Sequence, residues 1–167
     1  MAIVERDFNT EDLHPIDIVE SLAEERDWDF DRIADDQIAM AIEGAWGTYS
    51  VTLAFSGREE TLRLICAFEM APGSKRMAAF HKLMALANDK CWTGAFVHWP
   101  EQKLLVYRYS LNLAGGAQAT PEQIQDMLRN AVMACERFYP AFQLVAYGNE
   151  APEKALGIAM SEAYGRA

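Results

Sequence analysis

Histidine and cysteine are the residues with which this sequence could bind a metal or attack a substrate. The three histidines, His14, His81 and His98, fall in separate predicted elements, with no H-x-x-x-H or C-x-x-C pattern, so we expect no metal site. Cys91 and His98 flank one predicted turn, a spacing that would suit a cysteine–histidine nucleophile pair. Cys91 lies on the apolar side of a predicted helix, however, and a buried thiol without a nearby cation is inert. We therefore expect no catalytic, cofactor-binding or metal-binding residues.

Carboxylates are abundant in the first quarter of the chain. They are Glu24, Glu25, Asp27, Asp29, Asp31, Asp35 and Asp36. Paired carboxylates can act as acid and base when their surroundings separate their pKa values. These side chains fall at a predicted helix end, on the polar side of a strand and in a turn, which predicts a solvated acidic surface. Gly115-Gly116 has no following lysine and is interpreted as a hinge between strand and helix, not as a phosphate-binding loop.

Aromatic residues concentrate around the predicted strands, and most of them are expected to lie in the core. Two tryptophans are the expected exceptions: Trp46 falls in a turn and Trp99 precedes Pro100, and turns lie at the surface. If Trp99 and Arg108 are neighbours across two strands, they would offer a stacking and ion-pairing place for a protein partner. The candidate partner-binding residues are therefore Trp99, Arg108 and Trp46.

The elements that position these residues centre on a helix followed by a hairpin. Helical spacing of apolar residues predicts a helix from residue 74 to about Trp92, with Gly94 beyond its end. Residues 95–99 and 104–111 are predicted strands joined by a turn at residues 100–103. Alternation places Leu105, Tyr107, Tyr109 and Leu111 on one face of the second strand. The opposite face, which carries Arg108, is more mixed and is free to meet water or a partner.

The remaining patterns predict more strands early in the chain and more helices late. A helix is expected from Pro15, and Thr120 should cap another that Pro140 stops or kinks. Four early strands are predicted by alternating apolar residues, at about 28–33, 37–43, 48–55 and 62–68. The predicted fold is α+β, a single antiparallel sheet packed against helices in the order α-β-β-β-β-α-β-β-α-α. Residues 1–12 are expected to be a loosely ordered lead-in and residues 13–167 one domain.

Composition and charge narrow the class of protein further. The chain has 167 residues, of which 51% are hydrophobic and 24% charged, so a folded domain is expected. A formal net charge of -10 disfavours binding to nucleic acid or to an anionic membrane surface. The three cysteines lie far apart in the sequence and show no disulfide pattern, which indicates reduced thiols. No apolar run suggests a signal peptide or a membrane span, so a cytoplasmic location is expected.

Three stretches of the sequence resemble a known family. They are TYSVTLAFSGREETLRLICAFEM, LANDKCWTGAFVHWPEQKLLVYRYSL and RFYPAFQLVAYGNEAPEKALGIAMSEAYG. Together they look like the YbjN domain family of bacterial sensory transduction regulators, over roughly residues 14 to 165. The resemblance implies a fold similar to that of type III secretion chaperones, which are often homodimers that bind an extended partner segment. It supplies no catalytic residues for this sequence.

These observations lead to one functional hypothesis and two alternatives. The hypothesis is a non-enzymatic cytoplasmic regulatory or chaperone-like module that acts through protein–protein contacts as a homodimer. The first alternative is a small-ligand sensor whose pocket lies between the sheet and the helices. The second is an enzyme that uses carboxylates together with Arg108.

Overall fold

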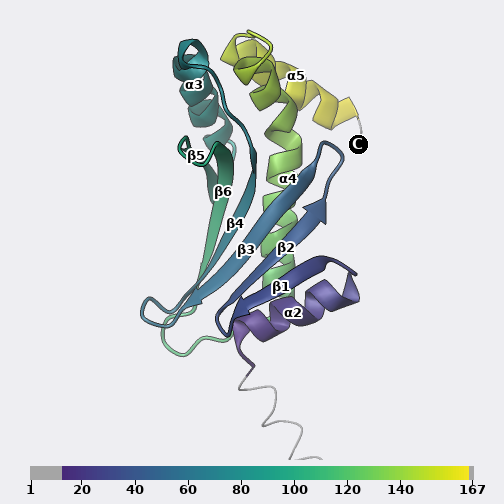
Figure 1. The fold of residues 1–167 in the computed structure, drawn as a ribbon, viewed down its shortest axis with the longest axis vertical. Coiled ribbons are helices and arrows are strands. Elements are labelled where there is room, and N and C mark those ends of the chain that lie inside the picture. The colour runs from purple at the N-terminus through teal and green to yellow at the C-terminus, as the bar shows by residue number, and fades with distance from the viewer. Residues whose placement is uncertain (1–12, 166–167) are drawn as a thin grey trace, which may run out of the picture.

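A six-stranded antiparallel sheet is the frame of the structure (Figure 1). The computed structural model describes residues 13–165, so the expected lead-in of residues 1–12 lies outside the described residues. In their order across the sheet, the strands are β1 (Asp29–Ala34), β2 (Gln37–Glu43), β3 (Thr48–Ser56), β4 (Thr61–Glu69), β6 (Leu104–Asn112) and β5 (Gly94–Trp99). The late hairpin is thus joined to the early strands through β6, which pairs with β4.

Helices cover one side of this sheet. They are α2 (Pro15–Glu25), α3 (Met77–Asn88), preceded by the short turn η1 (Ser74–Arg76), α4 (Pro121–Ala146) and α5 (Pro152–Gly165). The long helix α4 runs behind the sheet in Figure 1 and contacts β4 and β6, while α2 packs on β1, β2 and β3. Among the described residues, no helix combines the length and apolarity that crossing a membrane requires. The α+β class, the single antiparallel sheet and the predicted element order are all confirmed.

Period-two alternation explains which face of the sheet the helices cover. Every second residue of the four central strands points to the helices and is apolar, as in β3, where Tyr49, Val51 and Leu53 are fully buried. Beneath α3 and α4 the interior is filled by aromatic rings. The Phe96 ring centroid lies 5.1 Å from those of Tyr107 and Phe142. This packing fixes α4 against the hairpin of β5 and β6.

Helix α4 begins as the sequence predicts and continues where it was expected to break. Thr120 accepts a hydrogen bond from the Gln123 N–H, and the Gln123 side chain accepts one from the Thr120 N–H, which completes a capping box. Of the two outcomes expected at Pro140, a stop or a kink, the stop is wrong, because α4 continues to Ala146. A proline in a helix interior removes one backbone hydrogen bond, and the buried apolar stripe on both sides of Pro140 offsets that loss.

Helix α3 ends earlier than the sequence predicts, at Asn88 and not near Trp92. Its last residue explains the difference. The Asn88 side chain accepts a hydrogen bond from the Phe96 N–H at 2.7 Å and donates one to the Phe96 carbonyl at 3.1 Å. Both bonds are made with the backbone of the outermost strand, so the amide takes the place that a seventh strand would occupy at this point. Residues 89–93 then form the turn into β5.

The turn between β2 and β3 is fixed by a carboxylate from α4. Glu136 accepts hydrogen bonds from the Ala45 N–H at 3.0 Å, the Trp46 N–H at 3.4 Å and the Tyr49 hydroxyl at 2.5 Å. Gly44 leaves room for this arrangement, because an added Cβ would overlap the Glu136 carboxylate and come within 2.6 Å of the Tyr49 ring. The three bonds tie a hairpin at one end of the sheet to the middle of a distant helix.

Two buried tyrosines should make the free energy of unfolding depend on pH in the alkaline range. Burial raises the pKa of Tyr107 to about 12, and burial together with the Glu136 hydrogen bond raises the pKa of Tyr49 still further above its ordinary value of 10.0. Above pH 10 the unfolded chain releases these protons while the folded chain keeps them, so the free energy of unfolding should fall between pH 10 and pH 12. Urea denaturation at several pH values in this range measures the free energy of unfolding. In the Tyr107→Phe variant that free energy should fall less steeply with pH than in wild type. A level profile would contradict the prediction.

Two thiols meet in the core. The Cys66 and Cys135 sulfurs, from β4 and α4, lie 3.6 Å apart, and both residues are fully buried. Burial also raises the pKa of Cys135 and of the half-buried Cys91 above their usual values, so the reactive thiolate is scarce. We expect a thiol reagent to modify the native protein slowly and at Cys91 alone, and to modify all three cysteines after unfolding. Rapid modification of three thiols in the native state would argue against this packing.

Candidate interaction surface

The face of the sheet that points away from the helices carries partly or fully exposed side chains on β2 and β3, whereas Ala67 of β4 and Val106 of β6 on the same face are buried. Besides three charged side chains, Glu43, Arg63 and Glu69, this face carries mostly small or uncharged ones on β2, β3 and β4. They are Gln37, Ala39 and Ala41 on β2, Thr48, Ser50, Thr52 and Ala54 on β3, and Ile65 and Ala67 on β4. We call this surface the outer face. A smooth, weakly charged sheet surface of this kind permits close approach by another protein.

Strand register arranges the outer face in rows that cross the sheet. One row runs from Asp31 on β1 through Ala39, Thr52 and Ile65 to Arg108 on β6. Both end residues are exposed. Neither forms an ion pair with any residue of the described chain. The row therefore has an unpaired anion at one end and an unpaired cation at the other.

The three residues predicted to bind a partner lie in two places. Trp99 and Arg108 both project from the outer face, but they are not neighbours across strands: Trp99 pairs with Leu104 and Arg108 with Ala95. Four residues of β6 separate the two rows, a distance of about 13 Å. Trp46 lies in the β2–β3 turn, where its ring stacks on Tyr139 of α4 at 6.3 Å and an interplanar angle of 11°. The stacking and ion-pairing arrangement proposed for Trp99 and Arg108 is thus not formed between these two residues.

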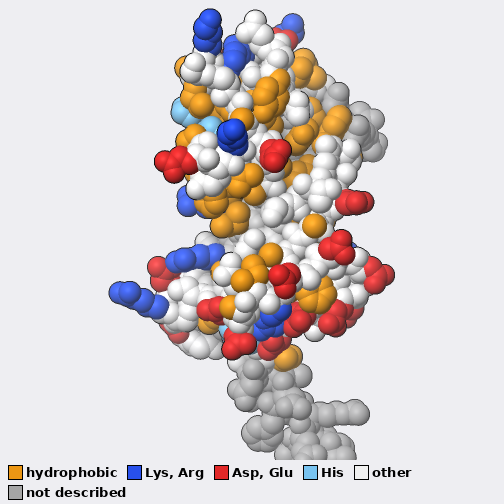
Figure 2. Space-filling view, in the orientation of Figure 1, with side chains coloured by type: hydrophobic (Ala, Val, Ile, Leu, Met, Phe, Trp, Pro, Cys, Tyr) orange, Lys and Arg blue, Asp and Glu red, His pale blue; other side chains and the backbone are white. Residues whose placement is uncertain are grey.

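Charge is distributed unevenly between the two ends of the molecule. Residues 13–43 contain ten acidic and two basic residues, whereas residues 44–161 contain ten acidic and eleven basic ones. Figure 2 shows acidic side chains crowding the lower part of the view, around β1 and α2. The predicted acidic surface is therefore confined to one end of the sheet, and the strands at the other end are close to neutral.

Sequence reasoning missed the most exposed large hydrophobic residue, Trp92. It was expected in the core, yet its side chain is 97% exposed in the turn after α3. The turn is held by the next residue, because the Thr93 hydroxyl and the Tyr107 hydroxyl lie 2.9 Å and 2.8 Å from the Asn130 side-chain oxygen of α4. The polar run of residues 88–90 was the signal that the helix ends before Trp92.

The cysteine and histidine considered as a nucleophile pair do not form one. The Cys91 thiol donates to the Ala87 carbonyl at 3.4 Å, while the His98 ring packs against Phe80 with centroids 5.0 Å apart. Burial lowers the pKa of His98, and the pKa of Cys91 is raised, so both groups stay neutral near pH 7. Residues 13–165 also bring together no group of three or more side chains suited to hold a metal ion.

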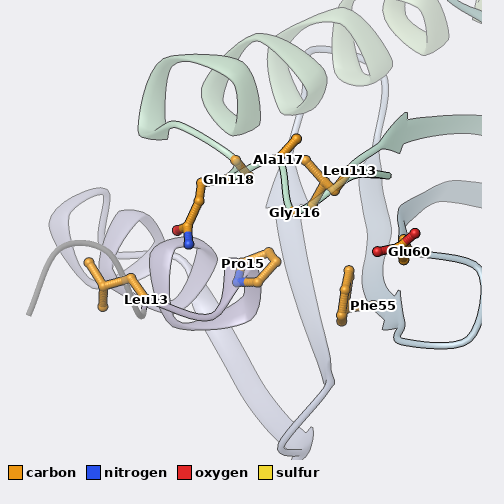
Figure 3. A pocket seen from close by; sticks show the side chains of 9 residues that line it. Leu13, Pro15, Phe55, Glu60, Leu113, Gly116, Ala117 and Gln118 are labelled. Atoms are coloured by element: carbon orange, nitrogen blue, oxygen red, sulfur yellow. The ribbon is translucent and has the colours of Figure 1, made fainter.

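A surface cavity lies between the start of α2 and the loop before α4 (Figure 3). Its volume is about 280 Å³, and its lining includes Pro15, Phe55 and Leu113. It lies at the end of the sheet and not between the sheet and α4, where the sensor hypothesis expects a pocket. A drug-sized ligand needs about 300–1,000 Å³, so this cavity is small for such a site.

Comparison with known proteins decides the family. The model for YbjN proteins, described as "Putative bacterial sensory transduction regulator", matches residues 15–144. The chain belongs to the YbjN family. This identification agrees with the resemblance seen in the sequence, and no curated protein matches the chain.

Two solved structures are similar to this YbjN-family chain. The first is described as "Crystal structure of YbjN, a putative transcription regulator from E. coli"; it has 13% sequence identity and a TM-score of 0.53, over 75% of this chain and 92% of that one. The second is a chain of the ExsC–ExsE complex, with 16% identity and a TM-score of 0.43, over 65% of this chain and 77% of that one. At 13% identity, the E. coli YbjN structure shows a shared fold and assigns no site.

Proposed function

We propose that this YbjN-family protein is a non-enzymatic cytoplasmic regulatory or chaperone-like module that acts through protein–protein contacts as a homodimer. The observation that carries the proposal is the outer face, a sheet surface whose side chains on β2 and β3 are mostly small and partly or fully exposed. The family's description as sensory transduction regulators supports a regulatory role. The net charge of -10 argues against nucleic acid as the partner.

The chemistry of the described residues supports a binding role over a catalytic one. Cys91 and His98 lie apart and are held neutral, which disfavours nucleophilic attack. Arg108 stands on an open sheet surface, whereas an enzyme needs its charged groups to converge in a cleft. The aromatic filling beneath α3 and α4 leaves the sensor hypothesis with less support than protein binding.

The homodimer is tested by measuring the molar mass in solution. Light scattering on the purified chain at micromolar concentrations is expected to give twice the chain mass of 18.7 kDa. A mass of one chain throughout this concentration range would remove the homodimer from the proposal. The protein-binding role is tested separately, by comparing the proteins that crosslink to wild type in bacterial cells with those that crosslink to Trp99→Ala. Identical sets, or none, would argue that Trp99 contacts no partner.

A further inference from the structure

We propose that the outer face binds the outer face of a second copy of the chain, with a two-fold axis that runs parallel to β3 between the two sheets. This inference rests on the proposed homodimer and names its surface. A two-fold contact is self-complementary, so each strand on one side of the axis must suit the strand at the same distance on the other side. The outer face meets this requirement along β3 and in the row that joins Asp31 to Arg108.

Strand β3 suits the axis because its outward side chains are small. Thr48, Ser50, Thr52 and Ala54 would each lie against their own copy, and none is large enough to hold the two sheets apart. One strand away from the axis, β2 lies over β4 of the second copy, which places Ala39 against Ile65, Ala41 above Ala67, which is only 5% exposed, and Gln37 against Arg63. Apart from Gln37 and Arg63, these pairs are small and apolar.

Two strands away from the axis, β1 of one copy lies over β6 of the other. Asp31 and Arg108 belong to the same row at equal distances from β3, so Asp31 of each copy meets Arg108 of the other. This contact occurs twice and gives both unpaired charges a partner. The acidic end of each chain likewise falls over the near-neutral strands of the other, which reduces the repulsion expected between two chains of net charge -10.

The size of the face agrees with a modest but specific dimer. Five strands spaced about 4.8 Å apart, with about 3.3 Å per residue along each, give roughly 500–700 Å² per copy. The total of roughly 1,000–1,400 Å² reaches the lower end of the range for stable protein interfaces. Glu43 and Glu69 would face each other at one end of the strands, where the twist of about 30° between packed sheets moves the side chains apart.

Charge reversal tests the pairing. Asp31→Arg and Arg108→Asp each create two like-charge contacts, so each is expected to raise the dimer dissociation constant by about a hundredfold in sedimentation analysis. An equal mixture of the two variants places every reversed charge against an opposite one, so a heterodimer of near wild-type affinity should form. Arg129→Asp, an exposed reversal on α4, is the matched control and should leave the dimer unchanged.

A second measurement does not depend on charge. Thr52 would lie on the axis, with its copy about 10 Å away across the two sheets. Thr52→Cys is therefore expected to give a covalent dimer with a short bismaleimide linker at low protein concentration, whereas wild type is not. Circular dichroism and melting temperature should show that each variant remains folded.

The outcomes separate this inference from the proposal on which it rests. A wild-type chain that is monomeric overturns both. A wild-type dimer that survives both reversals, or that resists linking at Thr52→Cys, keeps the homodimer and overturns this surface. If each charge-reversal variant is monomeric alone and the mixture of the two forms no heterodimer, the pairing of Asp31 with Arg108 is overturned.

Discussion

Replacing Phe96 with alanine is expected to lower the free energy of unfolding by about 4 kcal/mol, the cost of removing a buried aromatic ring and leaving a cavity. The side chain is 2% exposed, and its ring lies within 5.8 Å of the rings of Tyr107, Phe138 and Phe142, centroid to centroid. The hole would open between β5 and α4, where the backbone cannot close it without moving the helix. Urea denaturation measures the change.

Val97→Ala is the matched control for this substitution. Val97 is the next residue of the same strand and points to the outer face, where it is only partly buried. We expect Val97→Ala to lower the free energy of unfolding by about 1 kcal/mol, since the substitution removes two methyl groups and leaves little cavity. Equal losses for the two variants would show that Phe96 is not packed as the structure places it.

Replacing Glu136 with alanine is expected to lower the free energy of unfolding by about 3 kcal/mol. The change removes a charged acceptor of three hydrogen bonds and leaves the buried Tyr49 hydroxyl without its partner. The β2–β3 turn should also loosen, so faster amide hydrogen exchange is expected at Ala45 and Trp46. Denaturation and hydrogen exchange together distinguish a loosened turn from a general loss of stability.

Glu153→Ala provides the comparison for Glu136. Glu153 also forms an ion pair, with Lys82, but both side chains are more than half exposed. Exposed pairs of this kind contribute little to stability, so the variant should melt close to wild type. A loss of stability as large as that of Glu136→Ala would show that burial does not set the cost of removing these carboxylates.

Much of the fold could be predicted from the sequence because the local signals agree with one another. The alternation in β3 and β6 correctly identified which side chains face the helices, and Thr120 with Gln123 marked the start of α4. The failures occurred where a distant residue decides the outcome. Asn88 ends α3 because it binds the backbone of β5, and α4 passes Pro140 because packing on the sheet offsets the lost bond.

The candidate surface was less predictable than the fold. Alternation placed Arg108 on the open side of its strand, but the sequence does not tell which strand lies beside β6. Only the pairing of β6 with β4 puts Arg108 in the same row as Asp31, a residue 77 positions earlier in the chain. Trp92 was misplaced for a related reason, since its exposure depends on where α3 ends.

The amide of Asn88 has a consequence for how the protein can assemble. A sheet whose two edge strands both have unpaired backbone groups can add strands from other molecules without limit, which leads to fibres and precipitates. At Phe96 the Asn88 side-chain amide already satisfies the backbone N–H and carbonyl that an incoming strand would need, so strand addition is disfavoured at this point of the edge. Complexes of this chain are therefore steered toward closed assemblies of finite size.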